Sequence, residues 1–286
     1  MKSSGKSRHI LSISGGKDSS ALAIYMRDRQ MWRERLGKSI STPIESVEME
    51  YVFCDTHEEL QETYEYLDQL EATLGTKIVR LSADRGFKHW MEVHGNFLPS
   101  PQMRWCTKSL KIIPFEQFVG DDPVYSYIGI RGDEDRSGYI STKSNITPVY
   151  PFKEDGIDKQ DVFRILEDSG AGLPDYYRWR TRSGCYFCFF QRKAEWVGLM
   201  ENHPDLFERA KAYEKFDPDS GRRFTWSQGE SLEELSDPAR VAAIKTNHDL
   251  ALQRAIKSRP DQPLADNLSE AFDDDDDSMA CNICHI

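Results

Sequence analysis

Gly15 and Gly16, in the stretch SGGKDS, belong to the first segment whose residue types could do chemistry. Adjacent glycines carry no side chains where the backbone turns, so their amides can face an anion. Ser14 and Ser19 add hydroxyl donors, and Lys17 adds a full positive charge. The N-terminus of the helix expected to follow adds a partial positive charge. The spacing is neither GxxxxGK[ST] nor GxGxxG, so the segment predicts a phosphate-binding turn of another kind.

Cysteines form the second group that could do chemistry. Cys185 and Cys188 have the CxxC spacing of a metal chelate, and Cys106 lies on a separate segment. Cys54 is expected to be a buried strand thiol. The start MKSSGKSRH lacks the apolar core of a secretory signal, which predicts a cytoplasmic protein. Disulfides are rare in that compartment, so the thiols are interpreted as metal ligands, reactive groups or core residues.

The elements that must position these residues alternate between strand and helix. Such alternation predicts an α/β fold with a doubly wound, mostly parallel sheet that has helices on both faces. Strands are expected over residues 9–14, 46–56, 76–83, 123–130 and 146–152, and helices over 17–36, 57–75, 85–95, 107–119, 159–170, 194–216 and 237–258.

Three regions are predicted along the chain. Residues 1–152 are expected to form the nucleotide-binding α/β domain, and residues 153–260 a helical region that carries the CxxC pair. Residues 261–286 contain a run of aspartates and are expected to be a mobile acidic tail.

The SGGKDS turn resembles the SGGxDS motif of the PP-loop ATP pyrophosphatase superfamily. A turn without a ligand is the plain alternative, but a match at all five specified residues, between a predicted strand and a predicted helix, favours the motif. The resemblance implies that the turn binds the pyrophosphate end of ATP, that the reaction yields AMP, and that Asp18 helps to position Mg²⁺. The residues assigned to this nucleotide site are Ser14, Gly15, Gly16, Lys17, Asp18 and Ser19.

Two further segments are similar to the phosphoadenosine-phosphosulfate (PAPS) reductase branch of that superfamily. In FCDTHEELQETYEYL, Asp55 is expected at the carboxyl edge of the sheet, either as a nucleotide or metal contact or as a helix cap. YIGIRGDEDRSG resembles a GxRxxES-like element, which implies that Arg131 contacts a phosphate or sulfate and belongs with Lys17 and Asp18 in the catalytic set. The following acids depart from the pattern, and Asp133 and Asp135 are interpreted as solvated charges.

The cysteines resemble those of iron-sulfur sulfonucleotide reductases, which show CCxxRKxxPL and a later CxxC around a [4Fe-4S] cluster. The resemblance implies cluster ligation by Cys106, Cys185 and Cys188, with Thr107 at the place of the second cysteine. Cys284 is taken as the fourth ligand; Cys281, a non-cysteine group or an open iron are the alternatives. Zinc is the alternative metal, because CxxC thiolates also fit Zn²⁺.

Composition limits the partners. The formal net charge is −11, which argues against broad non-specific binding to a nucleic-acid backbone and leaves room only for a local basic groove. No run approaches the roughly 20 apolar residues of a membrane helix, so no membrane association is expected.

Residues 9 to about 216 most resemble PAPS-reductase-like proteins of DNA phosphorothioation systems, of the DndC and SspD type. The resemblance implies adenylation of a DNA backbone phosphate by ATP and its sulfuration. Expected partners are a cysteine desulfurase as sulfur donor and other phosphorothioation proteins, through which the chain reaches DNA. The alternatives are a sulfonucleotide (PAPS or APS) reductase with a nucleophilic tail cysteine near CNICHI, a tRNA thiolase, and a nucleotide-sensing scaffold stabilised by zinc.

Overall fold

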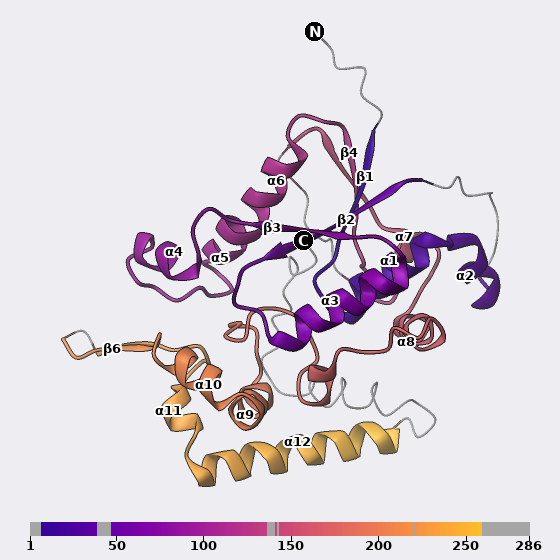
Figure 1. Cartoon of the computed structure of the whole chain (residues 1–286). Helices are drawn as coiled ribbons and strands as arrows, with labels where there is room; N and C mark the ends of the chain where they lie inside the picture. Colours follow the sequence, from indigo (N-terminus) through magenta and orange to yellow (C-terminus); the bar gives the residue numbers. More distant parts are fainter. Residues whose placement is uncertain (1–6, 39–46, 136–140, 142, 220, 259–286) are drawn as a thin grey trace.

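A five-stranded sheet forms the centre of the computed structural model, which describes residues 7–38, 47–135, 141, 143–219 and 221–258 (Figure 1). The strands lie in the order β3-β2-β1-β4-β5, and every neighbouring pair is parallel. The predicted parallel α/β sheet is therefore confirmed. The strands are β1 (Arg8–Ser12), β2 (Met49–Asp55), β3 (Ile78–Ser82), β4 (Val124–Tyr127) and β5 (Ile146–Val149).

Helices flank both faces of this sheet, with α1, α3 and α8 on one face and α6 on the other (Figure 1). The helices up to residue 178 are α1 (Lys17–Arg27), α2 (Arg29–Arg35), α3 (Gln61–Leu74), α4 (Phe87–Val93), α5 (Trp105–Thr107), a π-helical turn (Lys108–Ile112), α6 (Ile113–Val119), α7 (Pro151–Glu154), α8 (Lys159–Asp168) and a 3₁₀ turn (Asp175–Arg178).

Alternation along the strands explains the two cores. Successive strand residues point to opposite faces, so Leu11 and Phe53 pack in the core beneath α1, α3 and α8. Ile10 and Val52 pack on the other face, against Phe115 of α6. Because all strands run the same way, their carboxyl ends share one edge, where the turn after β1 lies beside the end of β2.

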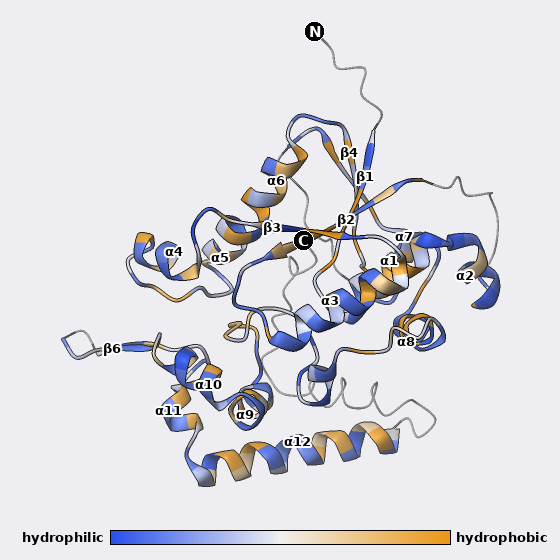
Figure 2. Ribbon diagram, viewed as in Figure 1, coloured by the Kyte–Doolittle hydropathy of each residue, from blue (hydrophilic) through white to orange (hydrophobic). Residues whose placement is uncertain are grey.

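The C-terminal part packs around aromatic side chains. Phe187 and Trp226 stack with ring centroids 5.2 Å apart, and Trp196 is fully buried beside them. Figure 2 shows apolar and polar residues alternating along α12, whose buried side includes Ile244. The elements here are α9 (Lys193–Asn202), α10 (Pro204–Lys211), β6 (Lys215–Asp217), β7 (Arg222–Phe224), α11 (Leu232–Leu235) and α12 (Pro238–Ser258).

Three expectations about elements are wrong in detail. The helix expected over 17–36 breaks at Asp28, whose side chain caps α2 by accepting a hydrogen bond from the Met31 amide. The helix expected over 194–216 breaks at Pro204, because proline cannot donate to the preceding turn. The region after residue 153 is not wholly helical, since β6 and β7 form an antiparallel pair.

Helix α8 packs on the sheet domain although it lies beyond the predicted boundary at residue 152. Helix α8 follows residue 153, yet Val162 and Ile165 pack in the same core as α1 of the sheet domain. The three predicted boundaries stay a prediction, and residues 261–286 lie outside the described residues. Among the helices that the structure describes, none is long and apolar enough to cross a membrane.

Glu230 joins α9 to α12 by accepting charged hydrogen bonds from Arg240 and from Lys193. The hydrogen bonds from Arg240, followed by that from Lys193, lower the pKa of Glu230 to about 2. A carboxyl whose pKa is lower in the folded state than in the unfolded state stabilises the fold at pH values above its unfolded-state pKa. This contribution is lost as the pH falls through the folded-state pKa.

We expect Glu230→Gln to lower the free energy of unfolding by less than about 1 kcal/mol at pH 7. Urea titrations should show the difference shrinking as the pH falls from 5 towards 2; a difference that grows on acidification would contradict the assignment.

Candidate functional site

The turn between β1 and α1 is closed by its own hydroxyls. The Ser14 amide donates to Ser19 Oγ at 3.0 Å, and the two serine hydroxyls are 3.0 Å apart. Ser19 Oγ in turn donates to the Gly16 carbonyl at 3.2 Å. These bonds hold the loop in one shape at the N-terminus of α1, where the helix dipole favours an anion.

Both glycines of the turn are required by close neighbours. Gly15 has φ +76°, and a Cβ there would lie 2.7 Å from Thr63 Cγ2 on α3. A Cβ on Gly16 would lie 2.8 Å from Ser183 Oγ. The glycine pair therefore serves the packing of α3 and of residue 183 as well as the turn itself.

Asp18 lies between two cations. Its Oδ2 is 3.1 Å from Lys17 Nζ, and its Oδ1 is 2.8 Å from Arg131 Nη1. Burial lowers the pKa of Lys17, but the negative charge of Asp18 raises it, and the pKa is raised overall, which keeps the ammonium protonated. Gly129, after β4, makes this approach possible, because a Cβ there would lie 3.0 Å from the Asp18 carbonyl oxygen.

The acids after Arg131 behave differently from one another. Asp133, expected to be solvated, is exposed but also accepts a hydrogen bond from Arg131 Nε at 2.9 Å. Glu134 lies 2.8 Å from Arg131 Nη1. Asp135 is exposed, as expected. Arg131 is thus held by carboxylates beside the loop, with the pKa of its guanidinium raised because Asp18 and Glu134 outweigh burial.

Asp55 ends β2 at the same edge of the sheet. Its Oδ1 accepts hydrogen bonds from the Tyr64 hydroxyl and from the His57 amide, both at 2.8 Å. The helix-cap interpretation is wrong, because the N-cap of α3 is Leu60. Asp55 is held as a buried carboxylate beside the turn, and its nucleotide or metal role stays a prediction.

The three predicted ligand thiols lie together. Cys185 Sγ is 3.2 Å from the hydroxyl of Thr56, just after β2. Burial, and then the neighbouring thiol of Cys188, raise the pKa of Cys106 to about 11. Burial lowers the pKa of Lys111, but Glu59 and the nearby thiols raise it overall, so its ammonium stays charged among them.

Cys54 lies on β2 and is not one of the predicted metal ligands. It is buried, its thiol donates to the Lys111 carbonyl at 3.5 Å, and burial raises its pKa to about 11. The prediction of a buried strand thiol is confirmed. Cys281 and Cys284, the candidates for a fourth ligand, lie outside the described residues.

The soft donor set fits an iron-sulfur cluster, since thiolates are its usual ligands. Cys106, Cys185 and Cys188 would hold the group, and the raised pKa values of Cys106 and Cys185 mean that binding must displace the protons of these two thiols. Within the described residues, no three His, Cys, Asp or Glu side chains are gathered closely enough to hold a single metal ion.

A single segment connects the phosphate turn to the thiols. Ser183 Oγ donates to Ser14 Oγ at 3.0 Å, and Cys185 follows two residues later. Tyr176 donates its hydroxyl proton to the Gly15 carbonyl at 2.7 Å, and Tyr177 accepts from the Lys17 amide at 3.0 Å. Sequence reasoning missed these two tyrosines and Ser183, although RSGC beside the CxxC pair was a signal for the serine.

Arg180 positions the CxxC segment from inside the protein. It is fully buried and donates to the carbonyls of Gly184, at 3.1 Å, and Cys185, at 2.9 Å.

We expect Arg180→Leu to lower the free energy of unfolding by about 2–4 kcal/mol, because two buried carbonyls lose their donors. Urea denaturation measures this. Arg178→Leu is the matched control, because Arg178 is 80% exposed and its loss should cost under about 0.5 kcal/mol; equal losses would contradict the positioning role.

The sequence profile of the phosphoadenosine phosphosulfate reductase domain matches residues 8–150, half of the chain. The chain belongs to this family. It is 27% identical over 213 residues to an uncharacterized protein of Methanocaldococcus jannaschii, covering 70% of this chain and 40% of that protein. A second uncharacterized protein of the same organism is 25% identical over 216 residues, covering 69% of this chain and 45% of that protein. The chain thus spans less than half the length of these curated relatives.

Two solved structures are similar at 13% identity. One is the PAPS reductase from Candida auris in a phosphate complex, with a TM-score of 0.44, covering 63% of this chain and 82% of that chain. The other is the U34-tRNA thiolase NcsA from Methanococcus maripaludis with its [4Fe-4S] cluster. Its TM-score is 0.38, and the match covers 73% of this chain and 71% of that chain.

Proposed function

We propose that this member of the PAPS reductase family is an ATP-dependent, AMP-forming sulfurtransferase whose acceptor is a DNA backbone phosphate. The observation that supports it is the 3.0 Å contact between Ser14 of the phosphate turn and Ser183, two residues before Cys185. This contact brings a nucleotide-type turn and a set of thiols into one site. An enzyme that activates an acceptor with ATP and then adds sulfur needs both in reach of the same acceptor phosphate.

The first half of the reaction uses the turn. A non-bridging oxygen of the acceptor phosphate attacks the α-phosphorus of ATP, and pyrophosphate leaves with the electrons of the broken P–O bond. The turn amides and the Lys17 ammonium hold the departing pyrophosphate, and Asp18 would position Mg²⁺. Asp18 already bridges Lys17 and Arg131, so these groups are arranged before the nucleotide binds.

The second half uses the thiols. A dithiol reduces the persulfide of a cysteine desulfurase, becoming a disulfide and releasing hydrosulfide. Hydrosulfide attacks the activated acceptor phosphorus; a P–S bond forms, AMP leaves, and one proton is released. Cys106, Cys185 and Cys188 would hold a [4Fe-4S] cluster, which supplies a binding place for sulfide when bound. The Lys111 ammonium among these thiols offsets the negative charge that they carry once deprotonated.

A reconstituted reaction tests this function. The chain, prepared without oxygen and with its iron and zinc contents measured, is mixed with ATP, Mg²⁺, cysteine, a desulfurase, dithiothreitol and DNA, with and without the other phosphorothioation proteins. We expect DNA-dependent release of pyrophosphate and AMP, and phosphorothioate dinucleotides by mass spectrometry after nuclease digestion. Pyrophosphate release without any sulfur in DNA under every condition would contradict the acceptor, and no pyrophosphate release would contradict the whole proposal.

Sulfonucleotide reduction is the second candidate, and the family match over residues 8–150 favours it. In that reaction a cysteine thiolate attacks the sulfur of PAPS, and a second thiol or an added dithiol then releases sulfite. The same preparation given PAPS and dithiothreitol would decide. Release of sulfite that is lost in Cys284→Ser, without pyrophosphate release from ATP, would replace the first proposal by this one.

A further inference from the structure

Glu59, on the turn between β2 and α3, lies beside the thiols and has no role in the reaction proposed above. Its Oε1 accepts a hydrogen bond from the Thr56 hydroxyl at 2.8 Å and lies 3.9 Å from Cys185 Sγ. The same Thr56 hydroxyl is 3.2 Å from Cys185 Sγ. A carboxylate therefore belongs to the same group of side chains as the predicted ligand thiols.

The second oxygen of this carboxylate has no partner within the protein. Glu59 is 8% exposed, and its Oε2 is buried and accepts no hydrogen bond from the residues that the structure describes. Leaving a carboxylate oxygen buried without a partner is costly. Such an oxygen is suited to bind a metal, because a carboxylate can accept at both of its oxygens.

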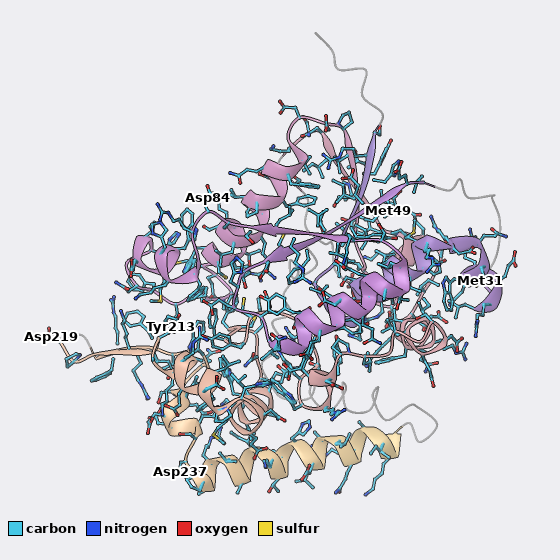
Figure 3. All side chains as sticks on the ribbon, in the orientation of Figure 1. Met31, Met49, Asp84, Tyr213, Asp219 and Asp237 are labelled. Carbon is cyan, nitrogen blue, oxygen red and sulfur yellow. The ribbon has the colours of Figure 1, made fainter. Side chains whose placement is uncertain are left out.

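The main chain holds this turn against the CxxC segment. The Tyr186 amide donates to the Glu58 carbonyl at 2.8 Å. His57 has φ +60°, an uncommon conformation for a residue other than glycine, which bends the chain sharply after β2. Figure 3 shows side chains filling the space between the sheet and the C-terminal helices, where the core contains both Leu60 and Tyr186. The place of Glu59 beside Cys185 thus does not depend on a single side-chain contact.

Charge connects Glu59 to the other thiols through Lys111. Burial lowers the pKa of Lys111, and the charge of Glu59, followed by those of Cys185 and the other thiols, raises it. Burial raises the pKa of Cys185, and the charge of Glu59 raises it further. Burial also raises the pKa of Cys106, which the neighbouring Lys111 ammonium lowers. Glu59, Lys111 and the thiols therefore form one electrostatic group.

The described thiols leave one position of a [4Fe-4S] cluster without a protein ligand. Cys106, Cys185 and Cys188 supply one ligand each, and the cluster has four irons. The side chains of the described residues are not gathered closely enough to hold one metal ion, but a cluster is wider than a single ion and needs its ligands farther apart. Glu59 is the buried carboxylate nearest in contact to this set.

We infer that Glu59 is the fourth protein ligand of this cluster and binds iron through Oε2, an inference that rests on the proposed function for the presence of a cluster. Coordination uses a lone pair of the carboxylate and needs neither an oxidant nor a reductant. Thr56 holds Oε1 and so keeps the carboxylate in one orientation. A carboxylate is a harder donor than a thiolate, so the iron that Glu59 binds would be the one at which sulfide can replace a protein ligand.

Mössbauer spectroscopy of the full chain, loaded with ⁵⁷Fe and sulfide without oxygen, tests the inference. We expect one iron of the unmodified chain to show the higher isomer shift of oxygen ligation, and Glu59→Gln to change the spectrum of that iron. The amide keeps the size of the side chain and an acceptor for Thr56, but it is a poorer ligand than a carboxylate. Changing even a partner of a metal ligand lowers metal affinity about 10–100-fold, so mild oxidation should release this iron from Glu59→Gln at least about 10-fold faster. The electron paramagnetic resonance signal of a three-iron cluster measures the release.

Glu58→Gln is the matched control, because it removes the same charge from the next residue, whose side chain pairs with Arg209 at 3.4 Å. It should leave the spectrum unchanged and the rate of iron release within about 2-fold. Cys281→Ser with Cys284→Ser should also leave the spectrum unchanged. Circular dichroism checks that each variant is folded.

Three results would overturn the inference. They are four sulfur-ligated irons or no iron in the unmodified chain, a Glu59→Gln spectrum equal to that of the unmodified chain, and loss of the distinct iron in the double cysteine variant. The measurements need neither ATP nor DNA. Sulfur transfer by a chain whose cluster does not depend on Glu59 would refute the ligand alone, and a cluster that depends on Glu59 in a chain without pyrophosphate release would refute the proposed function alone.

Discussion

Cys185→Ser is expected to reduce sulfur transfer to DNA by more than about 100-fold, because serine has no thiolate to offer and the other two thiols cannot complete the set. Serine keeps the size of the side chain and its contact with the Thr56 hydroxyl, which lies 3.2 Å from the sulfur. Pyrophosphate release should fall far less, since the turn and Lys17 are unchanged. Phosphorothioate content by mass spectrometry and pyrophosphate release in the same reactions measure both effects.

Cys54→Ala is the matched control, because Cys54 is buried on β2 and donates only to the Lys111 carbonyl. It should retain sulfur transfer and the metal content of the unmodified chain. The amount of iron or zinc bound per chain should be lower in Cys185→Ser than in Cys54→Ala. A serine variant with full sulfur transfer, or a Cys54 variant that loses it equally, would show that these thiols do not act as proposed.

Asp18→Asn is expected to lower pyrophosphate release about 10²–10³-fold. The carboxylate bridges Lys17 at 3.1 Å and Arg131 at 2.8 Å, and an amide would leave two neighbouring cations without their shared charge. The amide is also a poorer ligand for Mg²⁺ than a carboxylate. Steady-state pyrophosphate release at several Mg²⁺ concentrations measures the effect, and thermal unfolding shows how much of it is a loss of fold.

Asp133→Asn provides the comparison, because Asp133 also accepts a hydrogen bond from Arg131 but its side chain is 41% exposed. Its replacement should change pyrophosphate release less than about 3-fold, since exposed pairs contribute little. Equal losses in the two variants would mean that the orientation of Arg131, rather than the charge of Asp18, is what matters at this site.

Much of the fold could be predicted because its signals are local. The apolar run before Gly15 and the helical pattern after Asp18 mark β1 and α1, and Gly75 ends α3 in the left-handed conformation that glycine favours. The hairpin of β6 and β7 was missed, because two strands of three residues carry too little periodicity to be seen. The break at Pro204 did have a local signal, which the long helical pattern concealed.

Local sequence is enough to predict the phosphate turn, the CxxC pair and the succession of strands and helices, because each depends on neighbours along the chain. The tertiary structure was needed to show that Ser183 reaches Ser14 across 169 positions, and that Lys111 lies among the thiols. It was also needed to show that Glu59 lies beside Cys185. Contacts of this kind follow from how helices and loops pack on the sheet, and packing depends on the shapes of many side chains at once, which no local pattern records.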